Sequence, residues 1–268
     1  MQRTADAFQL SVAAAELYES RFVPALFAEW APHLLDVARV VPGTSVLDVA
    51  CGTGIVARTA ADRPNAGPVV GVDVNPAMLS VARRVRPDIE WREGNVARLP
   101  FPDASFQAAL CQMALMFFPD RPKALSEMAR VVTSGGTVAV VVPASLVSQP
   151  AYGPFVEIAA RYAGPEALSL LGTYWACGDV DELRALFEHA RLEVIEVRTR
   201  LGTARFDSID ALVATEVEST PLVDRIGPDV YRRIREDANV ALRRFTTPTG
   251  AAEIPLTAHI LAARKPAR

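Results

Sequence analysis

The stretch Val46-Leu47-Asp48-Val49-Ala50-Cys51-Gly52-Thr53-Gly54 determines how the rest of the sequence is interpreted. It combines an acidic residue at the end of an apolar strand, a tight turn with two glycines and the start of a helix. Because glycine has no Cβ, the backbone of such a turn can approach a ligand closely. The stretch therefore predicts a loop that binds a cofactor between a strand and the following helix.

Short runs of β-branched residues alternate with helical segments from Thr44 to Pro143, which is typical of βαβ units and a parallel sheet. The predicted strands are Ser45–Val49, Val69–Asp73, Ile89–Arg92, Phe106–Cys111 and Thr137–Val142, the last preceded by a turn at Ser134-Gly135-Gly136. The predicted helices are Ile55–Asp62, Pro76–Val85 after an Asn75 N-cap, and Arg121–Val132 after an Asp120 N-cap. We expect residues 42–143 to form the cofactor-binding core.

Two segments outside this core are expected to cover it. Residues 1–41 carry aromatic and aliphatic side chains at helical spacing, from Phe8 to Leu34, and predict an N-terminal helical cover. Residues 144–178 are rich in Pro, Gly, Ser and Tyr, and we interpret them as a lid insertion over the ligand end of the sheet.

Residues 179–268 are expected to complete the same domain. The predicted elements are a helix at Val180–Ala190, a strand at Leu192–Arg198, helices at about 208–218 and 229–245, and a strand at Pro255–Ala263. The predicted fold is therefore α/β and Rossmann-like, with seven strands, mostly parallel, and helices on both faces of the sheet. The last strand is expected to be antiparallel, and the cofactor to bind across the carboxyl ends of strands one, two and four.

Two classes of ligand are compatible with the glycine turn. The pattern Gly52-x-Gly54-x-x-Ala57, with Asp73 about twenty residues later, also matches a dinucleotide-binding fingerprint. A pyrophosphate on this helix N-terminus would, however, lie beside the Asp48 carboxylate, which is unfavourable in a desolvated site. S-adenosylmethionine has an ammonium and a sulfonium and no phosphate, so Asp48 favours it, and Asp73 can accept hydrogen bonds from both ribose hydroxyls.

The run "VLDVACGTG" resembles motif I of the class I S-adenosylmethionine-dependent methyltransferases, especially their ubiquinone-biosynthesis-like small-molecule branch. Three later segments agree in order and spacing: "VVGVDVNPAML" resembles the ribose-binding strand and helix, "EGNVARLPFPDASFQAAL" the adenine-binding loop and fourth strand, and "ALSEMARVVTSGGTVAVVVP" the next helix, turn and strand. The resemblance covers about residues 40 to 143 and implies S-adenosyl-L-methionine as the cofactor.

The resemblance also implies which residues bind that cofactor. Asp48, Ala50, Gly52 and Gly54 would hold the methionine end, Asp73 the ribose, Val74 and Met78 the adenine faces, and Asn95 with the Val96 backbone the adenine edge. Family members usually have Gly at the position of Ala50, although an alanine variant is familiar in this branch. Asn95 stands where Asp is usual, so its amide oxygen would accept from adenine without charge assistance and bind it more weakly.

The end of the fourth strand, from Cys111 to Phe118, indicates the kind of acceptor. Its sequence CQMALMFF contains neither an acid nor the Pro-Pro pair of amine- and nucleobase-modifying relatives, which argues against methylation of exocyclic amines. Its methionines and phenylalanines favour an apolar acceptor. Gln112 either contacts the cofactor or only binds nearby backbone.

No catalytic residue can be named from the sequence. The histidines are His33, His189 and His259, and each is more typical of a packed or exposed side chain than of a general base. A phenol, thiol or activated carbon acceptor would need at most one weak base, which agrees with the scarcity of histidine.

Composition excludes several partners. The formal charge of -3 provides no field that would attract nucleic acid. Apolar runs stay below the roughly 18 to 20 residues that span a bilayer, so no membrane association is expected. Cys51, Cys111 and Cys177 lack metal-ligand spacing, which predicts no metal site and a reducing, cytoplasmic location.

The sequence thus predicts an enzyme that transfers a methyl group from S-adenosylmethionine to an O or C atom of a small apolar or aromatic metabolite. It is expected to be a monomer or homodimer. Two alternatives stay open. A non-catalytic S-adenosylmethionine-binding sensor or scaffold has some support from Asn95, and an NAD-dependent oxidoreductase is opposed by Asp48.

Overall fold

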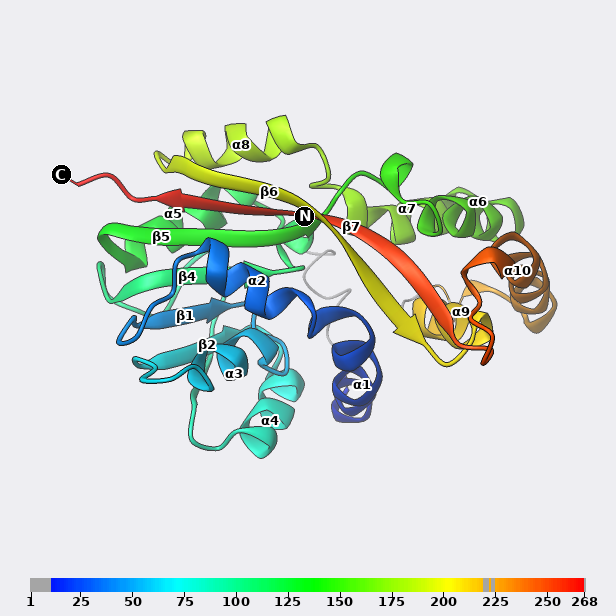
Figure 1. The fold of residues 1–268 in the computed structure, drawn as a ribbon, viewed down its shortest axis with the longest axis horizontal. Coiled ribbons are helices and arrows are strands. Elements are labelled where there is room, and N and C mark those ends of the chain that lie inside the picture. The colour runs from blue at the N-terminus through cyan, green and yellow to red at the C-terminus, as the bar shows by residue number, and fades with distance from the viewer. Residues whose placement is uncertain (1–10, 219–221, 223–224, 268) are drawn as a thin grey trace.

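A seven-stranded sheet forms the centre of the structure, a computed structural model that describes residues 11–218, 222 and 225–267. The strands are β1 (Val46–Val49), β2 (Val69–Asp73), β3 (Glu90–Glu93), β4 (Phe106–Gln112), β5 (Val132–Pro143), β6 (Glu193–Phe206) and β7 (Ala252–Arg264). Their order is β3-β2-β1-β4-β5-β7-β6. The first five pair in parallel, while β7 is antiparallel to both β5 and β6. The predicted fold class is confirmed (Figure 1).

Helices lie on both faces of this sheet and beyond its carboxyl end (Figure 1). They are α1 (Val12–Leu17), α2 (Trp30–Val37), α3 (Ile55–Ala61), α4 (Pro76–Val85), α5 (Arg121–Val131), α6 (Tyr152–Ala163), α7 (Pro165–Gly172), α8 (Val180–His189), α9 (Ile209–Glu218) and α10 (Pro228–Ala241). A π-helical segment, η2 (Tyr18–Phe27), joins α1 to α2, and two single turns are η3 (Leu115–Phe117) and η5 (Thr173–Trp175). Both predicted N-caps are confirmed, since Asn75 accepts from the Ala77 amide and Asp120 from the Lys123 amide, each at 2.9 Å.

Alternate residues of each strand enter different cores, because successive side chains of a strand point to opposite faces. Val46 and Leu110 pack with α2 on one face, whereas Leu47 and Cys111 pack with α5 and α8 on the other. Burial on both faces explains why these strands are continuous apolar runs. The predicted Phe8 lies outside the described residues.

The predicted turn at Ser134-Gly135-Gly136 lies inside β5 and does not precede it. The pairing of β4 with β5 shifts register between Phe106, opposite Val132, and Ala108, opposite Thr137. Gly135 has φ +77°, and a Cβ on Gly136 would lie 2.8 Å from the Gln107 carbonyl oxygen. The backbone at these two glycines therefore forms a bulge within β5, and β5 pairs with β4 on both sides of the bulge.

The last two strands are longer than the sequence predicts. They continue to pair until Phe206 lies opposite Ala252, whereas β5 ends at Pro143, opposite Ala258. Beyond that point β7 has a partner strand on one side only, so Pro255, which has no N–H, is tolerated there. The exposed polar residues of β6 resemble a loop in sequence, and this explains the shorter prediction.

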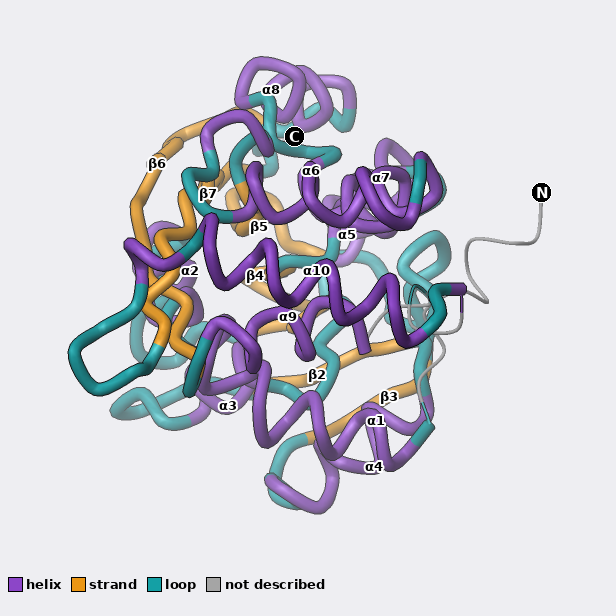
Figure 2. Tube along the Cα trace, turned by 90° about the vertical axis from the view of Figure 1, so that its right-hand side faces the viewer, coloured by secondary structure: helices purple, strands orange, loops and turns teal. Residues whose placement is uncertain are grey.

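The β6–β7 extension, residues 201–206 and 252–257, carries a group of helices beyond the carboxyl end of β5. Figure 1 shows α6, α7, α9 and α10 together at that end of the sheet, and Figure 2 shows them from that side, in front of the strands. Helix α10 packs against both α6 and α9. The cover thus includes helices from both 144–178 and 179–268, and the domain boundaries drawn from the sequence stay predictions. Within the described residues, every helix is too short or too polar to cross a bilayer.

Candidate functional site

Asp48 lies at the end of β1 and is almost completely buried, with 1% of its surface exposed. Its Oδ2 accepts a hydrogen bond from the Ala57 amide at 2.9 Å, in the first turn of α3. Burial raises the pKa of Asp48 to about 7; the Ala57 bond opposes this, and nearby Asp73 adds to it. The carboxylate therefore fixes the start of α3 and supplies negative charge behind the glycine turn.

Asp73, at the end of β2, holds the glycine turn from the other side. Its Oδ2 accepts from the Gly52 amide and its Oδ1 from the Asn75 amide, each at 2.8 Å. Burial raises the pKa of Asp73, while these backbone bonds oppose the rise. Two carboxylates on neighbouring strands thus meet at one turn.

The turn itself needs left-handed backbone. Ala50, Gly52 and Gly54 have φ values of +54°, +55° and +90°, a region in which a side chain costs roughly 1 to 2 kcal/mol. A Cβ on Gly54 would lie 2.1 Å from the Trp91 ring, so only glycine fits there. The buried Thr53 hydroxyl has no hydrogen-bond partner within the described structure, and it is therefore available to a ligand in the turn.

Tyr18 of η2 covers this turn. A Cβ on Gly52 would lie 3.7 Å from its ring and hydroxyl, and the ring stacks on Phe22 and Phe27 with centroid distances of 5.7 and 5.3 Å. Burial, and then the charge of Asp73, raise the pKa of Tyr18 well above its usual range. The sequence places Tyr18 only in the helical cover. Its contact with Gly52 is a tertiary contact, which local sequence does not predict.

Two polar contacts fix this cover in place. Arg58 of α3 forms a two-pronged ion pair with Glu19, at 2.6 and 3.1 Å, and both side chains are mostly buried. Gln112, at the end of β4, donates its Nε2 to the Phe27 carbonyl at 2.9 Å, while its buried Oε1 has no partner in the described structure. The Gln112 Nε2 atom therefore fixes the end of η2, and its Oε1 atom is left as a hydrogen-bond acceptor.

The remaining predicted residues lie along the same edge of the sheet. Val74 is exposed after β2, and Met78 is buried in α4 against Ala15 and Tyr18. Asn95 is exposed after β3, and its Oδ1 accepts from the amide of Ala97, within its own loop, at 2.8 Å. All ten predicted binding residues thus lie at or just beyond the carboxyl ends of β1 to β4. Their individual roles stay predictions.

The histidines have other surroundings. His259 bonds Thr199 Oγ1 at 2.8 Å and the Gly178 carbonyl at 3.2 Å, and burial lowers its pKa. His189 is exposed at the end of α8, and His33 is half-buried in α2. None of these positions indicates a catalytic base.

A family model described as a methyltransferase domain matches residues 47–140. The matched range contains every predicted binding residue and both carboxylates at the glycine turn, within a sheet of the order described above. The chain carries a class I S-adenosylmethionine-dependent methyltransferase domain. S-adenosyl-L-methionine is the methyl donor of this class, and its binding at the glycine turn stays a prediction.

Curated methyltransferases are similar to part of this chain. A demethylmenaquinone methyltransferase of Renibacterium salmoninarum is 40% identical over 134 residues, which are 50% of this chain and 54% of that protein. The chain thus spans about half the length of the curated relatives it matches, or less.

Two solved structures share the fold at low identity. Phosphoethanolamine N-methyltransferase 2 of Haemonchus contortus, in complex with S-adenosyl-L-methionine, has a TM-score of 0.61 at 18% identity, over 98% of this chain and 59% of that one. The [4+2]-cyclase SpnF has a TM-score of 0.56 at 20% identity, over 90% and 82%. The second example shows that this fold does not by itself determine the reaction.

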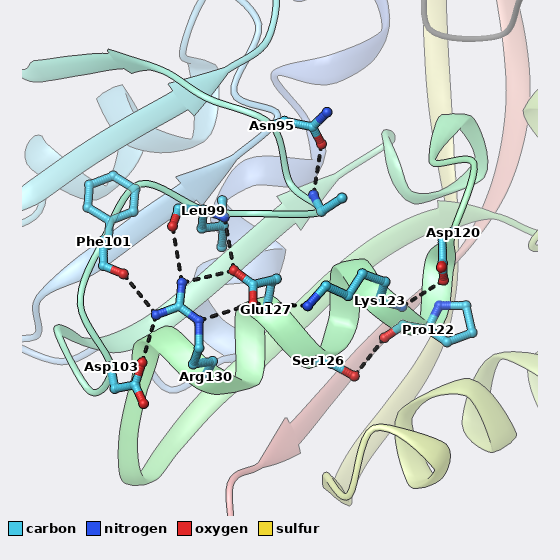
Figure 3. Close-up of polar contacts among 11 residues, drawn as sticks. Asn95, Leu99, Phe101, Asp103, Asp120, Pro122, Lys123, Ser126, Glu127 and Arg130 are labelled. Atoms are coloured by element: carbon cyan, nitrogen blue, oxygen red, sulfur yellow. Dashed lines mark hydrogen bonds and ion pairs between the residues drawn. The ribbon is translucent and has the colours of Figure 1, made fainter. Parts of the chain in front are cut away.

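The α5 clamp, formed by Glu127 and Arg130, holds the segment of the methyltransferase domain that follows Asn95 (Figure 3). The Leu99 amide donates to Glu127 Oε2 at 2.9 Å, and Arg130 donates to the carbonyls of Leu99 and Phe101 at 3.1 and 2.8 Å. Arg130 also pairs with Glu127 itself at 2.8 Å and lowers the pKa of that carboxyl. Sequence reasoning misses this clamp, because its partners are backbone groups about 30 residues away.

We expect Arg130→Met to lower the free energy of unfolding by about 2 kcal/mol, because it leaves two loop carbonyls and a mostly buried carboxylate with fewer partners. Urea unfolding at pH 7 measures this. Arg232→Met is the matched control: Arg232 also contacts two carboxylates, but on an exposed face of α10, so its loss costs about 0.5 kcal/mol or less. Equal losses in the two variants would contradict the clamp.

Asp48→Asn should change how stability depends on pH. The ordinary pKa of the carboxyl is 3.8 and its folded pKa is about 7, so between these values the folded protein binds more protons than the unfolded chain. The free energy of unfolding therefore falls as pH rises through this window. The variant should be more stable than the wild type at pH 8, and its unfolding free energy should change less from pH 5 to 8.

The same substitution should weaken binding of S-adenosylhomocysteine by about tenfold, because it removes charge beside the methionine ammonium. Urea unfolding and titration calorimetry measure the two effects. A variant with unchanged affinity and an unchanged pH slope would show that Asp48 only caps α3.

Proposed function

We propose that this chain transfers the methyl group of S-adenosylmethionine to an O or C atom of a small, largely apolar acceptor with an aromatic or quinone-like ring. The observation that carries the proposal is the set of aromatic rings at the end of β4. Phe117 of η3 packs edge-on against Tyr174 at 5.2 Å, and Trp175 packs against Tyr152 at 5.0 Å. Aromatic side chains at this position favour an apolar acceptor with a ring. The relatives named demethylmenaquinone methyltransferases support a quinone-like acceptor.

The cofactor edge has the chemistry that S-adenosylmethionine requires. The Asp48 and Asp73 carboxylates suit a cationic methionine end and ribose hydroxyls. Arg58, whose charge acts on the pKa of Asp48, is already paired with Glu19. The Gln112 Oε1 and Thr53 Oγ1 atoms are buried without partners in the described structure, and buried polar atoms are normally satisfied. We therefore expect a bound ligand to complete their hydrogen bonds.

The bound cofactor supplies an electrophilic methyl group on a positively charged sulfur. The chain's own residues have two tasks, to align the acceptor with this methyl and to exclude water. Tyr18, held by the Glu19 and Phe27 contacts, closes the turn from solvent, while Phe117 and Tyr174 would orient the acceptor ring. Alignment of this kind can contribute about 7 to 11 kcal/mol to lowering the barrier.

Binding and turnover test the proposal. Calorimetry should show saturable binding of S-adenosylhomocysteine and none of NADH. Labelled S-adenosylmethionine should then transfer its methyl to reduced demethylmenaquinone or to members of a panel of phenols and naphthols. Tight cofactor binding without transfer to any acceptor would favour the sensor or scaffold alternative and overturn the enzymatic proposal.

A further inference from the structure

Gln112 is the last residue of β4, and its side chain connects the sheet to η2, the segment that covers the glycine turn. It lies on the same face of the strand as Leu110, because alternate side chains of a strand point to the same face. Leu110 pairs with Asp48 across the parallel strands β4 and β1. Two residues further along both strands, this register places Gln112 beside Ala50, the first left-handed residue of the turn.

The partner of this side chain fixes the orientation of its amide. Nε2 donates to the Phe27 carbonyl at 2.9 Å. A carbonyl oxygen can only accept a hydrogen bond, so the Nε2 end must face Phe27 and the Oε1 end must face away from it. Oε1 is enclosed and has no hydrogen-bond partner among the residues that the structure describes. With η2 closed on the turn, one buried acceptor is therefore left unsatisfied, which is unfavourable.

Only a hydrogen-bond donor can satisfy an acceptor of this kind. The Thr53 hydroxyl in the turn is also buried without a partner in the described part of the chain, but a hydroxyl can donate as well as accept and specifies neither. The donors of S-adenosylmethionine are its ribose hydroxyls, its adenine amino group and its ammonium. Asp73 and Asn95 are the predicted partners of the first two. The ammonium is left for Oε1, at the sheet edge where Asp48 adds negative charge.

Phe27 is itself part of the packing that closes the turn. Its ring stacks on Tyr18 with a centroid distance of 5.3 Å, and a Cβ on Gly52 would lie 3.7 Å from the Tyr18 ring. Glu19, next to Tyr18, pairs with Arg58 of α3 at 2.6 Å. The bond from Gln112 thus holds the last residue of η2, the ion pair holds its start, and the Tyr18 ring stays over the turn.

Resting on the proposed function, which requires S-adenosylmethionine at this turn, we infer that Gln112 is a positioning residue that makes closure of η2 depend on the cofactor ammonium. A ligand shifts a conformational equilibrium only by binding one state better than the other. Phe27 fixes the amide only when η2 is closed, so the closed state binds the ammonium better. The site then selects a nucleoside that carries an amino-acid end, and a nucleoside without that end leaves η2 open.

Hydrogen exchange of the η2 backbone amides in the wild type tests this link. S-adenosylhomocysteine is compared with methylthioadenosine, which shares its adenine, ribose and sulfur but has no amino-acid end, each at a saturating concentration. S-adenosylhomocysteine should slow exchange in η2 by about tenfold or more, and methylthioadenosine by less than about twofold. Equal protection of η2 by the two ligands would overturn the inference.

Gln112→Leu removes both polar ends of the amide and separates its role from that of the rest of the turn. Affinity for S-adenosylhomocysteine should fall about tenfold and its protection of η2 should be lost, while affinity for methylthioadenosine stays within about twofold. Retained binding of methylthioadenosine also shows that the variant is folded. A folded Gln112→Leu protein in which S-adenosylhomocysteine still protects η2 as in the wild type would overturn the inference.

The matched control is Gln107→Leu, the same change on an exposed side chain in the first turn of pairing of β4, where Oε1 accepts from the Ser45 amide at 2.9 Å. Both affinities and the protection of η2 should stay as in the wild type. A loss of protection in this control equal to that in Gln112→Leu would overturn the specific role of Gln112.

These measurements do not depend on turnover. If S-adenosylhomocysteine protects η2, methylthioadenosine does not, and no acceptor of the panel is methylated, the inference stands and the proposed function fails. If an acceptor is methylated but both ligands protect η2 equally, the inference fails and the proposed function stands.

Discussion

Asp73→Ala is expected to lower the affinity for S-adenosylhomocysteine by about 50-fold. The variant removes the carboxylate acceptor predicted for the ribose, and one hydrogen bond to a charged group contributes roughly 1.5 to 3 kcal/mol, or about 10- to 150-fold in affinity. It also releases the amides of Gly52 and Asn75, which the carboxylate holds at 2.8 Å. The glycine turn would therefore lose its geometry as well as its ligand contact. Titration calorimetry at pH 7.5 measures the change.

Asp88→Ala is the control for this measurement. Asp88 is an exposed acid that pairs with Arg86 beyond the end of α4, so its loss should leave the affinity within about twofold. Circular dichroism should show that both variants are folded. An Asp73→Ala protein that is folded and binds S-adenosylhomocysteine as tightly as the wild type would mean that the ribose lies elsewhere.

Gly54→Ala is expected to have the largest effect on stability, a loss of about 3 to 5 kcal/mol in the free energy of unfolding. Its φ of +90° is unfavourable for alanine, and the new Cβ would lie 2.1 Å from the buried Trp91 ring. Trp91 cannot easily retreat, because it packs against Leu79 and Ala82 and its Nε1 donates to the Arg86 carbonyl at 2.8 Å. Urea unfolding of the purified variant measures this loss.

Gly43→Ala separates the two causes. Gly43 also has positive φ, +84°, but a Cβ there would meet nothing within 4 Å, so alanine should cost only about 1 kcal/mol. The difference between the two variants measures the contact with Trp91. Equal losses of unfolding free energy in the two variants would show that the turn moves away from the Trp91 ring. The contact between this ring and Gly54 would then contribute nothing to stability.

Much of the fold follows from local sequence. Asp48 in β1 and the two glycines that follow the strand predict the cofactor turn. The left-handed backbone of the turn favours glycine, and the Asp48 carboxylate can cap the helix that follows. Asn75 and Asp120 mark the starts of α4 and α5, since each side chain caps the helix that follows it. The antiparallel β7 is also predicted correctly, although its length is not.

Features that depend on distant partners are not predictable in this way. The ring of Tyr18 meets Gly52 only after α1 and η2 pack across the sheet edge, and Arg130 binds a loop whose backbone carries no side-chain signal. In each case the side chain is visible in the sequence, but its environment is made by a segment far away in the chain.

The β6–β7 extension sets how far α9 stands from the end of β5. Past Pro143 these two strands continue without β5, and α9 follows directly from the end of β6. A strand advances about 3.3 Å per residue and alternates its faces, so two residues added to each strand would carry α9 about 7 Å outward without reversing its inner side. Paired insertions of two residues in this ribbon would thus increase the separation between α9 and the end of β5, with the inner side of α9 still facing the same way.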